Sequence, residues 1–236
     1  MKLEIKNLNK NYQEKQVLKN INYTFEEGKI YGLVGRNGAG KTTFFNALNE
    51  DIRIDSGTFL LENEYGKNKL SSNDIGYVTA TPIVPEFLTG KEFLKFFLDI
   101  NKENIEDIKE IDEYFEFVKI QKEDQDTLLK DYSTGMKNKI QLLVNIIRNP
   151  KILLLDEPLT SLDIVVQEDM KKLLKKIKKD HIIILSTHIL EIALDLCDEI
   201  LVLNNKKIEC IEKKDLNTKA YKDKIIKMLK DEKNVE

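Results

Sequence analysis

The sequence predicts an α/β fold with a parallel core sheet, an N-terminal antiparallel β subdomain and an inserted α-helical subdomain. Three observations support this prediction. Near the N-terminus, apolar residues alternate with polar ones, as in half-buried strands. Later in the chain, short apolar runs alternate with helical patterns, which indicates a parallel sheet covered on both faces. Between these stretches lies a long block with helical periodicity alone.

The N-terminal part begins with two stretches of period-two alternation, which predict strands of an antiparallel sheet. Their apolar residues are Leu3, Ile5 and Leu8, followed by Ile21, Tyr23 and Phe25. A turn at Glu27-Gly28 then leads into a short apolar strand, residues 30–34, which runs directly into a glycine-rich loop. We expect a helix after this loop, since apolar residues follow at helical spacing between 44 and 48.

From about residue 82 to residue 150 the apolar spacing is helical. Strand signals then return at 152–155 and 182–185, with an amphipathic helix around 170–177 between them. We therefore expect a single domain over 1–236. Its predicted parts are a nucleotide-binding core with the β subdomain (1–80 and 150–210), a helical subdomain (81–149) and a charged, helical C-terminal tail (211–236).

The composition fits a soluble globular protein, with 41% hydrophobic and 33% charged residues. The formal net charge of -3 argues against a dedicated nucleic-acid binder, whose domain is usually strongly basic. The lysine-rich stretch 171–179 carries apolar residues at helical spacing, so we interpret it as a solvated helix face. Cys197 and Cys210 are expected to be buried hydrophobes in a reducing compartment rather than a disulfide.

The chain shows neither a membrane span nor a signal peptide. No apolar run approaches the roughly 20 residues that cross a bilayer. Residues 1–5 lack the apolar core of a secretory signal. We therefore expect a cytoplasmic protein, for which any membrane process would require another polypeptide.

A phosphate-binding loop is the most specific feature of the sequence. The segment from Gly35 to Thr42 satisfies G-x-x-x-x-G-K-[ST] and stands between an apolar strand and a helix, which predicts a P-loop NTPase. Its glycines allow backbone N–H groups to point at phosphate oxygens, and the helix adds its positive N-terminal end. Lys41 can reach the β- and γ-phosphates, and the Thr42 hydroxyl can bind Mg²⁺. The predicted nucleotide-binding residues here are Gly35, Asn37, Gly38, Ala39, Gly40, Lys41, Thr42 and Thr43.

A second motif supplies carboxylates. The apolar run 152–155 ends in Asp156 and Glu157. A buried parallel strand would deliver Asp156 to the metal at its C-terminal end. Glu157 follows immediately and could orient or deprotonate the attacking water. We therefore predict Thr42 and Asp156 as metal ligands, and Glu157 with Lys41 as catalytic residues.

Further motifs appear in a fixed order: Tyr12 before the P-loop, Tyr132-Ser133-Thr134-Gly135-Met136-Lys137 at a helix start, and His188 after an apolar strand. With these motifs the sequence resembles the ABC ATPase family over nearly its whole length. The resemblance implies that ATP and Mg²⁺ bind, that Tyr12 stacks on adenine and that His188 reaches the γ-phosphate. It also implies that Ser133 and Gly135 contact the ATP held by the opposite subunit, and that 159–163 is the loop that communicates across the dimer.

Two positions depart from the family pattern. Ala80 stands where the family usually has a Gln that helps to hold Mg²⁺ and signals to the membrane partner. Thr134 replaces the first Gly of the signature. Together with Met136 and Lys137, Thr134 resembles variants common in exporters of drugs, peptides or lipids.

The resemblance implies an ATP-binding subunit of an ABC transporter, working in a head-to-tail dimer. Its expected partners are a second copy or a paralogue and an integral membrane subunit, with no direct nucleic acid. Its expected place is the inner face of the cell membrane. The alternatives are a soluble ABC-type ATPase acting on nucleic acid, ribosomes or assembly machinery, and a module that holds ATP as a clamp without turnover. One half of an unequal heterodimer is a further alternative.

Overall fold

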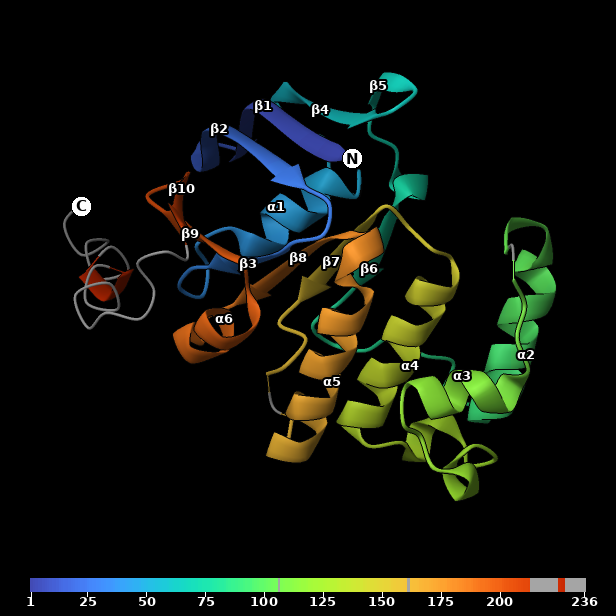
Figure 1. Ribbon diagram of the computed structural model, residues 1–236. Coiled ribbons are helices and arrows are strands. Elements are labelled where there is room, and N and C mark those ends of the chain that lie inside the picture. Colours follow the sequence, from blue (N-terminus) through green and yellow to red (C-terminus); the bar gives the residue numbers. More distant parts are fainter. Residues whose placement is uncertain (106, 161, 213–224, 228–236) are drawn as a thin grey trace.

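The computed structural model describes residues 1–105, 107–160, 162–212 and 225–227, and its strands form two sheets (Figure 1). The first sheet is antiparallel, with the order β2-β1-β4-β5. Its strands are β1 (Lys2–Tyr12), β2 (Lys15–Glu26), β4 (Ser56–Asn63) and β5 (Gly66–Lys69). The second sheet has the order β10-β9-β3-β8-β7-β6. Its strands are β3 (Ile30–Val34), β6 (Ile75–Val78), β7 (Ile152–Asp156), β8 (Ile182–Thr187), β9 (Glu199–Asn204) and β10 (Lys207–Glu212).

The α/β prediction is confirmed, with one refinement of the core sheet. Its strands β9, β3, β8, β7 and β6 are parallel, as the sequence predicts. Strand β10 is antiparallel to β9, so the sheet is mixed at this edge. In the N-terminal sheet the predicted alternation is also confirmed, because Leu3, Ile5 and Leu8 are buried while their neighbours are more exposed.

The helices follow the predicted periodicity. They are α1 (Lys41–Leu48), α2 (Gly90–Asn101), α3 (Ile111–Phe117), α4 (Thr134–Ile147), α5 (Ile164–Ile177) and α6 (Leu190–Leu196). Short 3₁₀ turns occur at Ser72–Asp74, Lys102–Asn104, Lys122–Asp124, Leu129–Asp131 and Lys178–Asp180. Helices α2, α3 and α4 lie between β6 and β7 in the chain, and α2 and α3 stand at the end of the molecule away from β10 (Figure 1). Within the described ranges, the helices all fall short of the length and apolar character that crossing a bilayer needs.

The core sheet separates two hydrophobic cores. Successive side chains of a strand point to opposite faces. Accordingly, Leu153 and Leu155 of β7 pack with α2 to α6, whereas Ile152 and Leu154 pack with α1 and the antiparallel sheet. Strand β8 divides its side chains in the same way. Helix α1, which follows the P-loop, is therefore packed between the two sheets.

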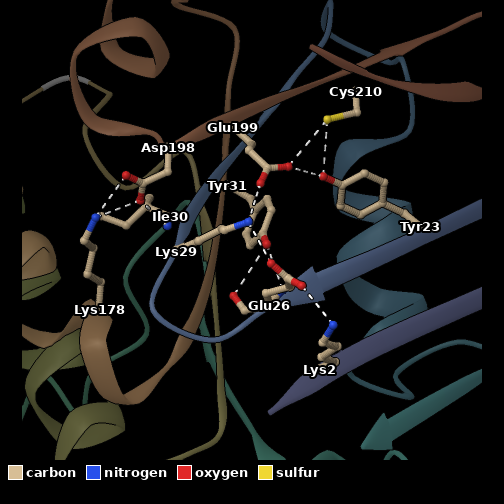
Figure 2. A network of polar contacts seen from close by, with 10 residues as sticks. All are labelled: Lys2, Tyr23, Glu26, Lys29, Ile30, Tyr31, Lys178, Asp198, Glu199 and Cys210. Carbon is tan, nitrogen blue, oxygen red and sulfur yellow. Dashed lines mark hydrogen bonds and ion pairs between the residues drawn. The ribbon is translucent and has the colours of Figure 1, made fainter. Parts of the chain in front are cut away.

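A polar network fixes the two sheets beside each other (Figure 2). The Lys29 ammonium lies 2.8 Å from a carboxylate oxygen of Glu26 at the end of β2 and 2.8 Å from one of Glu199 in β9. Hydrogen bonds from Lys29 and Lys2 lower the pKa of the Glu26 carboxyl to about 2. Asp198 accepts the backbone N–H of Ile30 at 2.8 Å, at the start of β3. The network thus anchors the entry of the strand that leads to the P-loop.

Two expectations are wrong at the C-terminal side. Ile211 and Glu212 belong to β10 and pair with β9, so the core sheet extends past the predicted boundary at 210. Most of the predicted helical tail lies outside the described residues, apart from 225–227, which are helical. Cys197 is buried as expected, but Cys210 is exposed because it lies on the edge strand β10.

Candidate nucleotide-binding site

The loop 35–40 leaves β3 and enters α1, as the sequence predicts. Gly40 has a φ of 108°, in the left-handed region that favours glycine. A Cβ at Gly40 would also lie 2.8 Å from Val17 of β2. A Cβ at Gly35 would lie 2.9 Å from the Leu203 carbonyl oxygen. The loop therefore approaches its neighbours too closely for side chains at these two positions.

Lys41 is the first residue of α1 and is buried. Its ammonium donates to the carbonyl oxygens of Gly35 at 2.9 Å and Arg36 at 3.4 Å. It also lies 3.5 Å from Oε1 of Glu157. The cation is therefore fixed on the inner side of the loop, close to the end of β7.

Thr42 and Asp156 meet across the site. The Thr42 hydroxyl donates to Oδ2 of Asp156 at 2.8 Å, and Asp156 is buried at the end of β7. A hydroxyl and a carboxylate are the hard oxygen ligands that Mg²⁺ prefers beside phosphate oxygens. Among the described residues, no cluster of three His, Cys, Asp or Glu side chains could form a closed metal cage. The pair therefore fits a magnesium ion whose other ligands would come from the phosphates of a nucleotide and from water.

Glu157 directs its carboxylate to three partners. Oε2 accepts a hydrogen bond from the Thr160 hydroxyl at 2.8 Å and lies 3.0 Å from Nδ1 of His188. Burial raises the pKa of Glu157, but the hydrogen bonds from Thr160 and His188 and the charge of Lys41 outweigh it. The pKa of Glu157 is therefore below its ordinary value, and the carboxylate is charged at neutral pH.

A cleft of about 390 Å³ opens over these groups. It is lined by Tyr12, Lys15, Val17, Asn37, Gly38, Gly40, Lys41, Thr42, Thr43, Ala80, Asp156 and Glu157. A second cleft of about 530 Å³ adjoins it, since both are lined by Asn37, Ala80 and Glu157. The second cleft also takes in His188, Thr160 and the segment 80–82.

Most of the predicted residues come together here. Tyr12 ends β1 at the rim of the first cleft and is 45% exposed, so its ring is accessible. Ala80 faces both clefts, at the point where the chain leaves β6, and offers no ligand atom. Ser133 and Gly135 line neither cleft. Ser133 instead caps α4, where its hydroxyl accepts the Met136 N–H at 3.2 Å.

Sequence reasoning missed two residues that touch the carboxylates. The Ser186 hydroxyl donates to Oδ1 of Asp156 and accepts the Glu157 N–H. Thr160 donates to the Glu157 carboxylate. The available signal for Ser186 was its place in the sequence, directly after the predicted strand 182–185 and two positions before His188. Asp163, in the predicted dimer loop, caps α5 through the Val166 N–H, whereas Ser161 of that loop lies outside the described residues.

Comparison with known proteins identifies the family of the chain. The family model "ABC transporter" matches residues 18–160. The chain is 32% identical to the uncharacterised ABC transporter ATP-binding protein YxlF of Bacillus subtilis, over 87% of this chain and 69% of that one. It is 35% identical to an uncharacterised ABC transporter ATP-binding protein of Methanocaldococcus jannaschii, over 87% and 75%, respectively.

Solved structures share the fold. One described as an ATP-binding subunit of an ABC transporter has a TM-score of 0.79 at 22% identity, covering 97% of this chain and 99% of that one. Another, a dimeric ATP-binding cassette in a post-hydrolysis state with ADP and Pi, has a TM-score of 0.76 at 21% identity, covering 89% and 98%. The matched family model, the sequence relatives and the P-loop with its paired carboxylates establish that the chain belongs to the ABC transporter family as an ATP-binding protein, and that it is an ATPase.

Proposed function

We propose that the chain hydrolyses ATP in a head-to-tail dimer and drives substrate movement through a separate membrane subunit. The observation that carries the proposal is the arrangement of Lys41, the Thr42–Asp156 pair and Glu157 around one cleft. These are the groups that phosphoryl transfer requires: a cation for the phosphates, ligands for a metal and a base for water. A module that only clamps ATP would not require the charged, hydrogen-bonded Glu157.

In the proposed reaction, the N–H groups of the loop and Lys41 bind the β- and γ-phosphates. Thr42 and Asp156 would hold Mg²⁺, which would neutralise charge on the phosphates when bound. Glu157 accepts the proton of the attacking water, for which its ionised state is suited. His188 orients that carboxylate from the neighbouring strand end. Tyr12 is proposed to stack on the adenine ring.

The start of α4 is the proposed contact with the nucleotide site of the second subunit. Ser133 and Gly135 line neither cleft of their own chain. A serine at a helix N-terminus suits an anion from outside the chain. We therefore propose that Ser133 and Gly135 complete the site of the opposite subunit, a second copy or a paralogue. The dimeric ATP-binding cassette among the structural relatives supports this arrangement by analogy.

The membrane subunit is proposed to dock beside the cleft, on the segment 79–87. Ile83 is 74% exposed and Phe87 is 78% exposed, which is unusual for large apolar side chains. Residues 80–82 and Glu86 of the same segment line the second cleft. Docking there would place the chain on the inner face of the membrane and connect cleft closure to transport.

Export is the proposed direction of transport, on the Met136-Lys137 signature variant. One relative, 31% identical over 86% of this chain and 66% of its own length, is named a bacitracin transport ATP-binding protein of Enterococcus faecalis. The rival function on nucleic acid or ribosomes is disfavoured by the net charge of -3.

The test of the function is Glu157→Gln. We expect steady-state ATP hydrolysis to fall about 10²- to 10⁴-fold, because the base is lost. ATP affinity should remain, and the variant should accumulate as a dimer with ATP. The matched control is Glu168→Gln on α5, whose carboxylate is half exposed and pairs with Lys171. Normal turnover in the Glu157→Gln protein would contradict the proposed function.

A further inference from the structure

Ser186 is a fully buried polar residue that lies in the second-last position of β8. Strands β7 and β8 are parallel, and their register places Ser186 directly beside Asp156. His188 follows two positions later, just beyond the same strand end. The end of β8 therefore presents two polar side chains to the end of β7.

The Ser186 hydroxyl forms hydrogen bonds with two consecutive residues, Asp156 at the end of β7 and Glu157 directly after it. It donates to Oδ1 of Asp156, while the other oxygen of that carboxylate accepts from Thr42. It accepts the backbone N–H of Glu157 at 3.0 Å. One hydroxyl thus fixes both the carboxylate of the proposed metal ligand and the main chain of the proposed base.

The second bond matters because the backbone of Glu157 is unusual. Glu157 has a φ of 51°, in the left-handed region that a residue with a side chain rarely adopts. Such a conformation persists only where its surroundings hold it. The Glu157 N–H bond to Ser186 and the carboxylate bonds to Thr160 and His188 hold the two ends of this residue.

We propose that Ser186 is a positioning residue for ATP hydrolysis, which rests on the function proposed above. It sets the carboxylate of Asp156 for the metal and turns Glu157 toward the cleft. It acts through these two residues and lines neither cleft itself. A merely structural hydroxyl, by contrast, would contribute to stability and leave metal binding and turnover unchanged.

The experiment compares Ser186→Ala with Ser186→Thr. In the alanine variant we expect the turnover number to fall about 10- to 100-fold, as is typical when a partner of a metal ligand is removed. Calorimetric titration with ATP should show that the gain in affinity on adding Mg²⁺ shrinks about fivefold or more. ATP affinity in the presence of a chelator should stay within about twofold, because the loop and Lys41 are untouched. The threonine variant keeps the hydroxyl and should recover most of both properties.

Tyr31→Phe is the matched control, since the Tyr31 hydroxyl is also buried and accepts a backbone N–H, that of Glu26, at 2.7 Å. It should change the melting temperature and leave turnover and the Mg²⁺ effect unchanged. A folded Ser186→Ala protein with normal turnover and a normal Mg²⁺ effect would overturn the proposal. Equal defects in folded alanine and threonine variants would also overturn it. If Glu157→Gln retains full turnover, the proposed function itself fails, which is a separate result.

Discussion

The charge of Glu157 depends on partners from three parts of the chain. Lys41 comes from the start of α1, Thr160 follows β7, and His188 follows β8. Together they lower the pKa of Glu157 despite its burial. Since the folded-state pKa is depressed, Glu157 contributes stability above its ordinary pKa, and this contribution is lost as the pH falls through the folded-state value.

The lowered pKa of Glu157 gives a prediction for the stability of the Glu157→Gln protein. At pH 7 the wild type should have the larger free energy of unfolding, because only the carboxylate gains from Lys41 and His188. As the pH falls below about 4.5, the difference between the two proteins should shrink. Urea denaturation of both proteins from pH 7 to pH 3 measures it. A difference that stays constant over this range would mean that folding does not lower the pKa of Glu157.

At the residue scale, the sequence predicts what lies within a continuous motif. Lys41, Thr42, Asp156 and Glu157 follow from local patterns, and the structure brings them together. Ser186 and Thr160 escape prediction, because their role depends on which strand lies beside β7 and in which register. A lone hydroxyl has no motif around it that specifies its partner.

At the scale of elements, α6 packs unusually close to β3. A Cβ added at Gly32 of β3 would lie 2.8 Å from Sγ of Cys197 and 3.2 Å from Cβ of Ala193. Gly32 therefore has no room for a side chain while Cys197 keeps its sulfur. The close approach also explains why Cys197 is buried against the strand that feeds the P-loop.

Gly32→Ala is expected to reduce the free energy of unfolding by about 1–3 kcal/mol, because an extra methyl group overpacks this contact. Urea denaturation measures the loss. The double variant Gly32→Ala/Cys197→Ala removes the sulfur that the methyl group meets, and it should recover much of the stability. Additive losses in the double variant would contradict the contact as the cause.

The predicted helices and parallel strands are confirmed where their apolar patterns are long, as in α4, α5, β7 and β8. The boundary at 210 failed for a different reason. The residues Lys207 to Glu212 mix charged and apolar side chains, as an edge strand does, and in sequence they resemble the start of a charged tail. Pairing with β9, and not composition, decides that they belong to the sheet.

At the scale of the whole molecule, the antiparallel sheet and the core sheet enclose α1 from two sides. The P-loop therefore leads into a helix that is packed between the two sheets, whereas α2 and α3 lie at the end of the molecule away from β10 (Figure 1). The presence of an antiparallel sheet and a parallel core sheet could be predicted from the period-two pattern near the N-terminus and the alternation of strands and helices after it. Their mutual anchoring through Lys29, Glu26 and Glu199 could not, since these charges are distant in sequence and have no motif.

The proposed dimer gives a prediction for the molecule as a whole. In a Glu157→Gln background, Ser133→Arg should bind ATP with an affinity within a few-fold of its parent, because Ser133 lines neither cleft of its own chain. It should nevertheless stay monomeric with ATP, since the arginine would obstruct the opposite subunit's site. Mass photometry with and without ATP measures this. Ser72→Arg, at an exposed serine before β6, is the control and should dimerise normally. ATP-dependent dimers of the Ser133→Arg protein would contradict the arrangement.

The register of β7 against β8 has a last consequence. The alignment that sets Leu153 and Leu155 into one core also sets Asp156 beside Ser186. A slip by one residue would move every side chain of the strand to the wrong face and would separate the two polar residues at the same time. The same register therefore determines both the packing of the core and the placement of the polar residues in the site. A chain with a shifted register would lose its stability and its activity together.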